Sequence, residues 1–410
     1  MASKFVYKMF QEYYNRDFHL ETAPEQINSR EFGFVLFSEG VVRHKKFETN
    51  DELTAFLRKF VPLDAYYSCA YYENPEADME RKGWLGADLI FDIDADHIPT
   101  TCEQLHEEWT CSNCKFSGKG RVPKKCPVCG EEKFDVKTWP CETCLASAKQ
   151  EMIKLLEMLM HDFGFSKDEI HVFFSGHRGY HIHVECEAVK ELDSMARKEI
   201  VDYVSSIGLE VSLHAPDVKS LEKKTNFGRN IKFLSSGWSQ RLFLGVQNFL
   251  AKAREDDLRK LGLKGDAVNI IINNKDLILR GLRELEKWPS VRGLGSETWR
   301  KIMENVIVLQ SAKIDTVVTT DIHRLIRLPE TLNSKTGLKK VEFQISAVND
   351  FDPFRDAVAF KRGMVEVKVS NAPRFRLGDE TFGPYTNKKV ELPTAAALLL
   401  VCRDRAEVVE

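Results

Sequence analysis

The feature that most limits how this chain can fold is a dense group of cysteines. Ten cysteines occur in 410 residues, and seven of them fall within residues 100–144. Cys111-x-x-Cys114 and Cys126-x-x-Cys129 are two pairs separated by an eleven-residue spacer, which is typical of a zinc ribbon. Because this stretch has no amphipathic period, we predict an insertion that is ordered by metal and not by an apolar core.

The remaining composition is that of a globular protein. At 410 residues and 43% apolar content, two or three domains or subdomains are expected. No apolar run approaches the ~18 residues of a membrane span, and the first residues lack the apolar core of a signal peptide, so we expect a cytoplasmic protein. In that compartment paired cysteines bind zinc and do not form disulfides. A net charge of −3 neither supports nor excludes nucleic acid, so any phosphate site must be a local patch.

Apolar periodicity predicts mixed α/β structure. Strands are expected at 31–37, 89–94, 170–174, 180–184 and 364–369, and helices at 51–60, about 152–163, 193–206 and 395–401. Residues of about 210–305 are mostly helical in pattern and heavily charged, as in a helical insertion or subdomain.

An apolar run, Leu89-Ile-Phe-Asp-Ile-Asp, predicts a buried strand with acids at its end. Asp92 and Asp94 would project from one face, about 7 Å apart. They would repel each other without cations, and Mg²⁺ or Mn²⁺ suits such oxygens. A solvated acidic strand end is the simpler alternative, but the apolar lead-in favours a metal site. Asp96 lies past the expected strand end and ranks below the other two.

A glycine-bearing turn, Ser175-Gly-His-Arg-Gly-Tyr-His, joins two of the expected strands. Its glycines allow close backbone approach, and Arg178 can bind phosphate in a fork. His181 and His183 share a strand face, so one of them can flank the same pocket. Alone, the pattern also fits a hairpin tip with incidental polar residues.

Residues 313–329 are interpreted as a strand that ends in basic residues, followed by a further loop. Asp315 can supply a third carboxylate, and a triphosphate can be held by Arg324, Arg327 and Lys335. A surface strand of mixed charge is the alternative.

Taken together and in order, these segments resemble the catalytic small subunit of archaeal and eukaryotic DNA primases. The resemblance is carried by Phe91-Asp-Ile-Asp-Ala-Asp-His, by Ser175-Gly-His-Arg-Gly-Tyr-His, and by Asp315 with Arg324-Leu-Ile-Arg-Leu-Pro and Lys335-Thr-Gly. It implies an α/β (α+β) fold with a primase-type mixed sheet, RNA-recognition-motif-like in part. Residues 1–410 would form one catalytic domain that contains a zinc-binding insertion at 100–145 and the helical insertion at about 210–305.

The resemblance also implies roles for single residues. Asp92, Asp94 and Asp315 would bind the catalytic metals. Contacts to the nucleotide phosphates would come from Ser175, His177, Arg178, His181, Arg324, Arg327, Asn333 and Lys335, and a weaker match links Glu31 and Arg43 to initiation. Two positions depart from the family pattern: Asn333 replaces a common histidine and His177 replaces an arginine of some members. Phosphate affinity would then be lower, or pH-dependent through His177.

Members of this family carry a Cys/His zinc site between the acidic strand and the next helix. We therefore expect one or two structural zinc ions, in two nested sites. The outer site would use Cys102, His106, Cys141 and Cys144, with His97 as an alternative to His106, and the inner site would use Cys111, Cys114, Cys126 and Cys129. Four-ligand sites of this kind are closed and structural.

The activity implied is template-directed, de novo synthesis of short primers from nucleoside triphosphates, with two Mg²⁺ or Mn²⁺ ions and release of pyrophosphate. The implied partners are a large regulatory subunit and a single-stranded DNA template. Two other functions fit the same residues: a related primase-polymerase that extends existing ends, and a non-enzymatic zinc-ribbon module that binds nucleic acid.

Overall fold

The structure is a computed structural model that describes residues 4–98, 100, 102, 108–211, 237–284 and 291–409. The chain divides into two compact units. The sheet unit comprises Met1–Ile153, Ser166–Lys198 and Lys313–Glu410, and the helical unit comprises Lys154–Phe165 and Glu199–Ala312. Among the described residues, no helix has both the length and the apolar character needed to cross a membrane.

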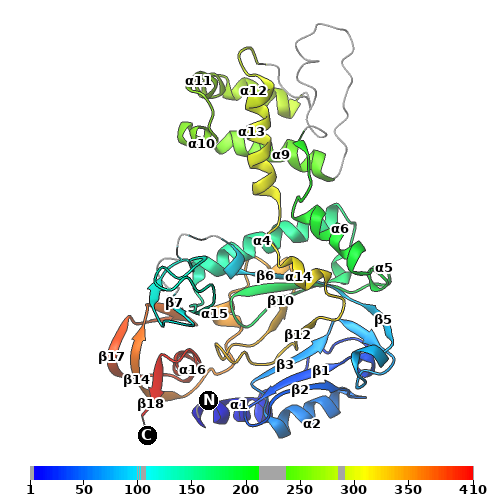
Figure 1. Cartoon of the computed structure of the whole chain (residues 1–410), viewed down its shortest axis with the longest axis vertical. Helices are drawn as coiled ribbons and strands as arrows, with labels where there is room; N and C mark the ends of the chain where they lie inside the picture. Colours follow the sequence, from blue (N-terminus) through cyan, green and yellow to red (C-terminus); the bar gives the residue numbers. More distant parts are fainter. Residues whose placement is uncertain are drawn as a thin grey trace. The chain divides into compact units, whose positions relative to one another are not determined.

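The N-terminal part of the sheet unit builds a four-stranded antiparallel sheet with the order β12-β3-β1-β2 (Figure 1). Its elements are α1 (Lys4–Arg16), β1 (Phe32–Leu36), β2 (Gly40–Lys45), α2 (Asn50–Phe60), β3 (Asp64–Ser68) and β12 (Leu325–Arg327). Thr49 caps α2 by accepting a hydrogen bond from the backbone N–H of Glu52, as the first turn of a helix requires. Ile326 pairs with Tyr67, so β12 joins a late segment of the chain to an early one.

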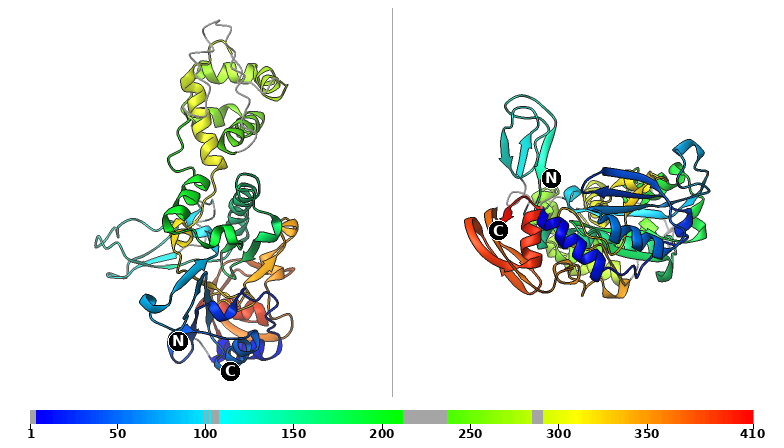
Figure 2. Two further views of the ribbon diagram at one scale, coloured as in Figure 1. Left: turned by 90° about the vertical axis from the view of Figure 1, so that its right-hand side faces the viewer. Right: turned by 90° about the horizontal axis from the view of Figure 1, so that it is seen from below.

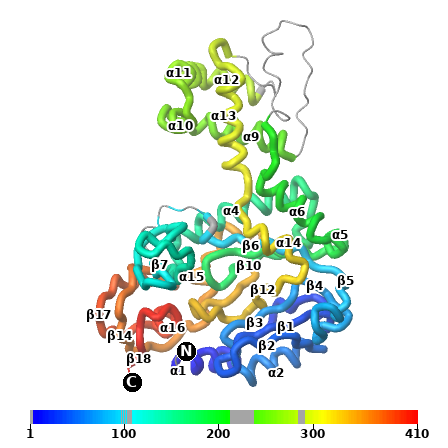
Figure 3. The backbone as a smooth tube through the Cα atoms, in the orientation of Figure 1, coloured from blue at the N-terminus to red at the C-terminus, as the bar shows by residue number. Residues whose placement is uncertain are grey.

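A second antiparallel sheet, with the order β13-β10-β11-β6, lies at the centre of the sheet unit. Its strands are β6 (Leu89–Asp94), β10 (Ile170–Phe174), β11 (Gly179–Val184) and β13 (Val341–Phe343). Every residue of the inner strand β11 is buried. The short helix α14 (Thr316–Thr320) packs on β6, as the tube in Figure 3 shows.

The C-terminal part of the sheet unit is a three-stranded sheet, β17-β14-β18, with one helix packed against it. Its elements are β14 (Met364–Ala372), β17 (Tyr385–Pro393), α16 (Thr394–Cys402) and β18 (Ala406–Val408). Seven of the nine residues of α16 are buried because the helix lies between this sheet and α1 (Figure 2).

Smaller elements complete the sheet unit. They are the hairpins β4 (Ala70–Tyr72) with β5 (Trp84–Ala87) and β15 (Phe375–Leu377) with β16 (Glu380–Phe382), the helices α5 (Glu187–Lys190) and α15 (Pro353–Asp356), and a small sheet of β7 (Glu108–Cys111), β8 (Ser117–Lys119) and β9 (Phe134–Lys137). Short 3-10 helices span Ile27–Ser29, Met79–Arg81, Ala95–His97, Lys167–Glu169 and Ile345–Ala347.

Helices dominate the second unit. They are α9 (Gly237–Lys252), α10 (Glu255–Lys260), α11 (Gly265–Asn273), α12 (Lys275–Glu284) and α13 (Ser296–Gln310), and α4 (Glu142–His161) and α6 (Ser194–Val204) enter it from the sheet unit. Gly245 lets α9 approach α13 closely, since a Cβ there would lie 2.4 Å from Val306 Cγ1. The buried carboxylate of Asp162 accepts hydrogen bonds from Tyr203 and Arg241, which ties the end of α4 to α6 and α9.

The mixed α/β class predicted from periodicity is confirmed, with the expected strands β1, β6, β10, β11 and β14 in place. One element differs from the prediction. Residues 313–329 do not form a continuous strand, because Asp315 caps the helical turn of α14 and only Leu325–Arg327 pairs in a sheet. An aspartate that can accept a backbone N–H two residues later favours a helix start over an extended chain.

Candidate active site and zinc sites

Two aspartates of β6 lie on the same face of the central sheet. Phe91 and Ile93 are fully buried, whereas the alternating Asp92 and Asp94 are partly exposed. The pattern follows from the two-residue period of a strand. The sequence therefore placed both carboxylates on one face correctly.

The third aspartate joins them from a distant part of the chain. The backbone N–H of Asp315 donates a 2.8 Å hydrogen bond to the carbonyl of Asp92, which fixes the start of α14 beside β6. One carboxylate oxygen of Asp315 accepts the N–H of Val317 at 2.9 Å, as the cap of α14. The start of α14 therefore lies beside β6, and the Asp315 carboxylate acts electrostatically on that of Asp92, although residues 92 and 315 are far apart in sequence.

Burial and mutual repulsion act on this group. Burial, then the neighbouring Asp94 and Asp315, raise the pKa of Asp92 to about 7, against an ordinary value of 3.8. Among the described residues, the ligand atoms of each of two cysteine groups all lie within 4.8 Å of one another. The carboxylate oxygens of the three aspartates do not form such a group. Carboxylates that repel in this way are a donor set for hard divalent cations.

The predicted glycine turn connects β10 to β11 next to these acids. The Ser175 hydroxyl accepts the backbone N–H groups of His177 and Gly179, at 3.3 and 3.2 Å, which closes the turn. Gly179 lies opposite Asp94, and a Cβ there would lie 2.3 Å from the carbonyl oxygen of Ile93. Only glycine allows β11 to approach β6 so closely at this point.

His181 lies opposite Asp92 in the central sheet, with its Nε2 3.5 Å from Asp92 Oδ1. Burial, followed by the positive charge of Lys340, lowers the pKa of His181 well below its ordinary value. The imidazole is therefore neutral at physiological pH and can take part in hydrogen bonds only. Lys340 is itself buried and donates to the carbonyl of Arg327 at 2.8 Å, so it ties the backbone of β12 to β11 next to the cleft without lining it.

Acidic and basic residues together line one cleft of about 240 Å³. The cleft is lined by Asp64, Tyr66, Asp92, Asp94, Ser175, His177, His181, Val318, Arg324, Leu325, Ile326, Arg327, Asn333, Ser334 and Lys335. Within the described part of the chain, the side chains of Arg324 and Lys335 have no ion pair or hydrogen bond of their own. They are therefore available to an anion that enters the cleft.

Arg327 differs from these two cations. Its Nη1 lies 2.6 Å from Asp64 Oδ1 and also donates to the carbonyl of Leu332 at 3.2 Å. Asp64 in turn accepts the backbone N–H and the hydroxyl of Ser334, at 3.1 and 2.7 Å. Asp64 therefore orders Arg327 and the loop that carries Asn333 and Lys335.

Four residues of the predicted set, Asp315, Arg178, Glu31 and Arg43, are not among those that line the cleft, and a fifth, His177, lines it in a neutral form. Arg178 is 1% exposed, does not line the cleft, and forms an ion pair with Asp96. Glu31 is fully buried and also lies outside the cleft lining, where it holds Arg43 at 3.0 Å and the buried Lys82 at 3.1 Å. His177 lines the cleft, but burial and the neighbouring cations, Arg403 first among them, lower its pKa well below the ordinary value. Its neutral form therefore persists through the physiological range.

The cysteines form two groups, as the sequence indicates. In the small sheet β8-β7-β9, the sulfur of Cys111 lies 3.5 Å from that of Cys129, and that of Cys114 lies 3.6 Å from that of Cys126. In the second group, the sulfur of Cys102 lies 3.3 Å from that of Cys144 and 3.6 Å from that of Cys141, just before α4. Such spacings suit tetrahedral thiolate sites, so these clusters can hold zinc. The predicted ligand His106 lies outside the described residues, as does the side chain of its alternative, His97.

Comparison with known proteins places this geometry in a family. A family model described as DNA primase small subunit matches residues 134–345. The DNA primase small subunit PriS of Nitrosopumilus maritimus is 33% identical over 406 residues, which cover 99% of this chain and 98% of that protein. Those of Cenarchaeum symbiosum and Methanothrix thermoacetophila are 32% identical over 401 residues (97% and 96% coverage) and 34% identical over 429 residues (99% and 99%). This chain belongs to the DNA primase small-subunit family.

A primase small subunit is a nucleotidyltransferase-type enzyme, which agrees with a cleft that brings carboxylates and cations together. Sequence reasoning missed Asp64, Tyr66 and Ser334 as lining residues of this cleft. Asp64 carries no signal in the sequence, because an aspartate at the start of a short apolar strand is common at surfaces. Only its ion pair with Arg327 identifies it.

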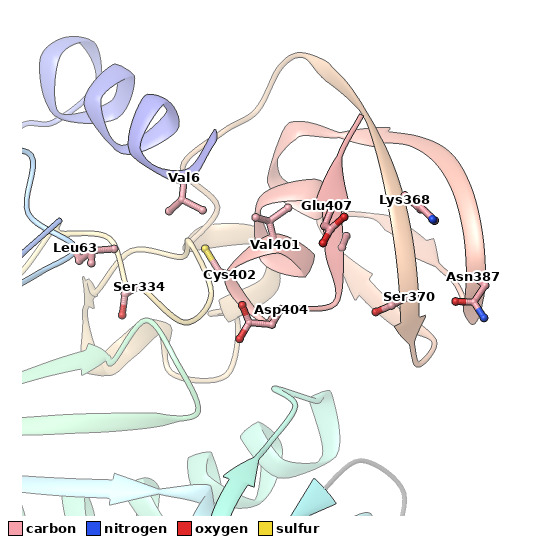
Figure 4. A pocket seen from close by; sticks show the side chains of 11 residues that line it. Val6, Leu63, Ser334, Lys368, Ser370, Asn387, Val401, Cys402, Asp404 and Glu407 are labelled. Atoms are coloured by element: carbon pink, nitrogen blue, oxygen red, sulfur yellow. The ribbon is translucent and has the colours of Figure 1, made fainter. Parts of the chain in front are cut away.

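A second cavity of this primase small subunit, about 600 Å³, adjoins the cleft at Ser334, which lines both. Figure 4 shows it, with Cys402 and Asp404 between Ser334 and the C-terminal sheet. Its charged lining is mixed in sign, with Lys368 against Asp404 and Glu407. The cavity therefore lacks the cationic character of a phosphate site.

Proposed function

We propose that this chain synthesises short primers de novo on a single-stranded DNA template from nucleoside triphosphates, releasing pyrophosphate. The observation that carries the proposal is that Asp315 joins Asp92 and Asp94 at β6, beside a cleft that Asp92 and Asp94 line together with Arg324 and Lys335. Nucleotidyl transfer requires carboxylates that bind divalent metal ions and basic side chains that bind phosphates, and both kinds of residue are present here.

We assign Asp92, Asp94 and Asp315 as the ligands of two divalent cations, Mg²⁺ or Mn²⁺. The donor set fits, because all three groups are carboxylates, and burial together with their mutual repulsion already raises the pKa of Asp92. When bound, such ions lower the pKa of an attacking hydroxyl and neutralise charge on the phosphates.

The binding of phosphate in the cleft is assigned to Arg324 and Lys335, whose side chains form no ion pair or hydrogen bond with the described residues. Ser175, His177, His181 and Asn333 line the same space and can donate or accept hydrogen bonds. Arg327 lines it as well, but its pair with Asp64 makes its main task the orientation of the loop that carries Lys335. Fixing the triphosphate in this way contributes mostly through proximity.

The remaining assignments extend from the family. We propose a large regulatory subunit as the partner, a cytoplasmic location, and one structural zinc ion in each cysteine group. Glu31 and Arg43 lie outside the cleft lining, so a role in initiation would involve a second nucleotide that binds away from it.

The decisive experiment measures dinucleotide formation on single-stranded template without a supplied primer. Asp94→Asn keeps the shape of the side chain and removes its charge, so we expect synthesis to fall by about a thousandfold, as when an essential electrostatic group is lost. Asp379→Asn, on an exposed residue of the β15–β16 turn, is the matched control and should keep full activity.

Near wild-type synthesis by Asp94→Asn would exclude the assignment of metals to these aspartates. A wild-type chain that only extends a supplied 3′ end would instead be a primase-polymerase. A chain that binds template and makes no product under any condition would be the non-enzymatic module.

A further inference from the structure

Arg403 directly follows α16 and contacts a residue that lines the cleft, although the sequence motifs do not include it. Its Nη1 is 3.5 Å from Nε2 of His177, which lines the cleft. Its Nη2 is 3.4 Å from the hydroxyl of Thr138, just after β9. The guanidinium thus bridges the glycine turn and the end of the small cysteine-bearing sheet.

The charge of Arg403 is not balanced in the way that its neighbours' charges are. Arg178 forms an ion pair with Asp96, and Arg405 lies 2.7 Å from the carboxylate of Glu108. No carboxylate of the described residues lies within 4 Å of the Arg403 guanidinium. Burial, with the positive charges of Arg178 and Arg405, lowers the pKa of Arg403 to about 10 against the smaller opposing effect of Asp96, which still leaves it charged at neutral pH. A cation held in this way favours a nearby anion.

The contact also fixes the proton of His177. A guanidinium has N–H donors and no acceptor, so Nε2 of His177 must accept. A neutral imidazole that accepts at Nε2 carries its proton on Nδ1, where it is a donor. Ionised phosphate oxygens only accept hydrogen bonds, so this tautomer suits a triphosphate and the other one opposes it.

We propose that Arg403 is a positioning residue of the triphosphate site: it acts through His177, holding the tautomer whose Nδ1–H donates to a phosphate oxygen. The inference rests on the proposed function and deepens it. It adds to the phosphate site a residue that follows the C-terminal helix. That residue lies outside the glycine-turn motif and outside residues 313–335.

The test compares steady-state synthesis by the full chain and its variants on one template. Arg403→Leu should raise the KM for nucleoside triphosphate about tenfold, the effect of losing one charged hydrogen bond, with little change in kcat. Arg403→Lys should recover most of the affinity, because an ammonium can also donate to Nε2. Arg405→Leu removes a neighbouring arginine that has its own carboxylate, and it should keep the wild-type KM.

A double-mutant cycle then separates action through His177 from a general effect. In a His177→Ala background, Arg403→Leu should add little to KM, because the pair acts as one unit. The proposal would be overturned if the fold-changes in KM of the two single variants multiply in the double variant. It would also be overturned if Arg403→Leu changes KM no more than Arg405→Leu does. If circular dichroism shows that the leucine variant is unfolded, the same cycle is run with Arg403→Gln and judged by the same outcomes.

Failure of this inference is distinguishable from failure of the proposed function. A wild-type chain that forms no dinucleotide defeats the function itself. A fully active wild type, with Arg403 variants that match it in KM, removes only the role of Arg403.

Discussion

At the scale of single residues, the site depends on charged groups that the fold buries at a cost in free energy. Asp92 is the clearest case, because burial and two neighbouring carboxylates raise its pKa to about 7. Asp64 shows the opposite solution, since its carboxylate is buried but paired with Arg327 and Ser334. Asp92 and its two neighbouring carboxylates are arranged to bind cations, whereas Asp64 orders Arg327 and the loop after it.

The raised pKa of Asp92 predicts a pH-dependent response to divalent ions. Because the folded-state pKa of about 7 lies above the ordinary 3.8, ionised Asp92 destabilises the metal-free fold above pH 7, and this cost is relieved as the pH falls from 7 toward 4. A cation binds the ionised form, so Mn²⁺ should raise Tm more at about pH 8 than at about pH 6. Calorimetry with and without Mn²⁺ measures this. Equal shifts at both pH values, or a difference that persists in Asp92→Asn, would contradict it.

At the scale of elements, two short segments of the sheet unit have different roles. The start of α14 brings Asp315 to β6, and one carboxylate oxygen of Asp315 caps that helix while the residue faces the other acids. The small sheet β8-β7-β9 is a different kind of element. Its strands have three or four residues each, and Trp109 packs against Phe116 and Phe134 as its only ring cluster in the described ribbon. Such a core is too small to be stable by itself.

Zinc removal should therefore unfold the ribbon while the rest of the sheet unit stays folded. We expect about two zinc ions per chain, and Cys126→Ser should lose one of them because a four-thiolate site is needed. Elemental analysis counts the metal, and limited proteolysis after chelation should cut within residues 108–137. Cys186→Ser, which changes a cysteine outside both groups, is the control and should keep two. A wild-type count of one or none would contradict the two-site assignment.

At the scale of the whole molecule, two compact units share one chain. The sheet unit is built from three separate stretches, and the helical unit is formed largely by the residues between the second and third of them. The cleft belongs wholly to the sheet unit, because all of its lining residues do. Ligands of the cleft should therefore stabilise one unit and leave the other unaffected.

This organisation predicts thermal unfolding that is not two-state. Mn²⁺ with a nucleoside triphosphate should raise the transition of the sheet unit and leave that of the helical unit unchanged, since binding stabilises only the unit that binds. Differential scanning calorimetry, with and without the ligands, checks this. A single transition that shifts as a whole would show that the units unfold together.

The sequence alone determined the local parts of this protein. Alternation along Leu89–Asp94 placed Asp92 and Asp94 on one face, and the Cys-x-x-Cys pairs defined the ribbon, because strand period and ligand spacing are properties of neighbouring residues. Tertiary structure alone decided that Asp64 pairs with Arg327, that Arg178 turns away to Asp96, and that Arg403 reaches His177. These contacts join segments 82 to 263 residues apart, and no local pattern encodes them, because such a pairing is set by how whole sheets and helices pack.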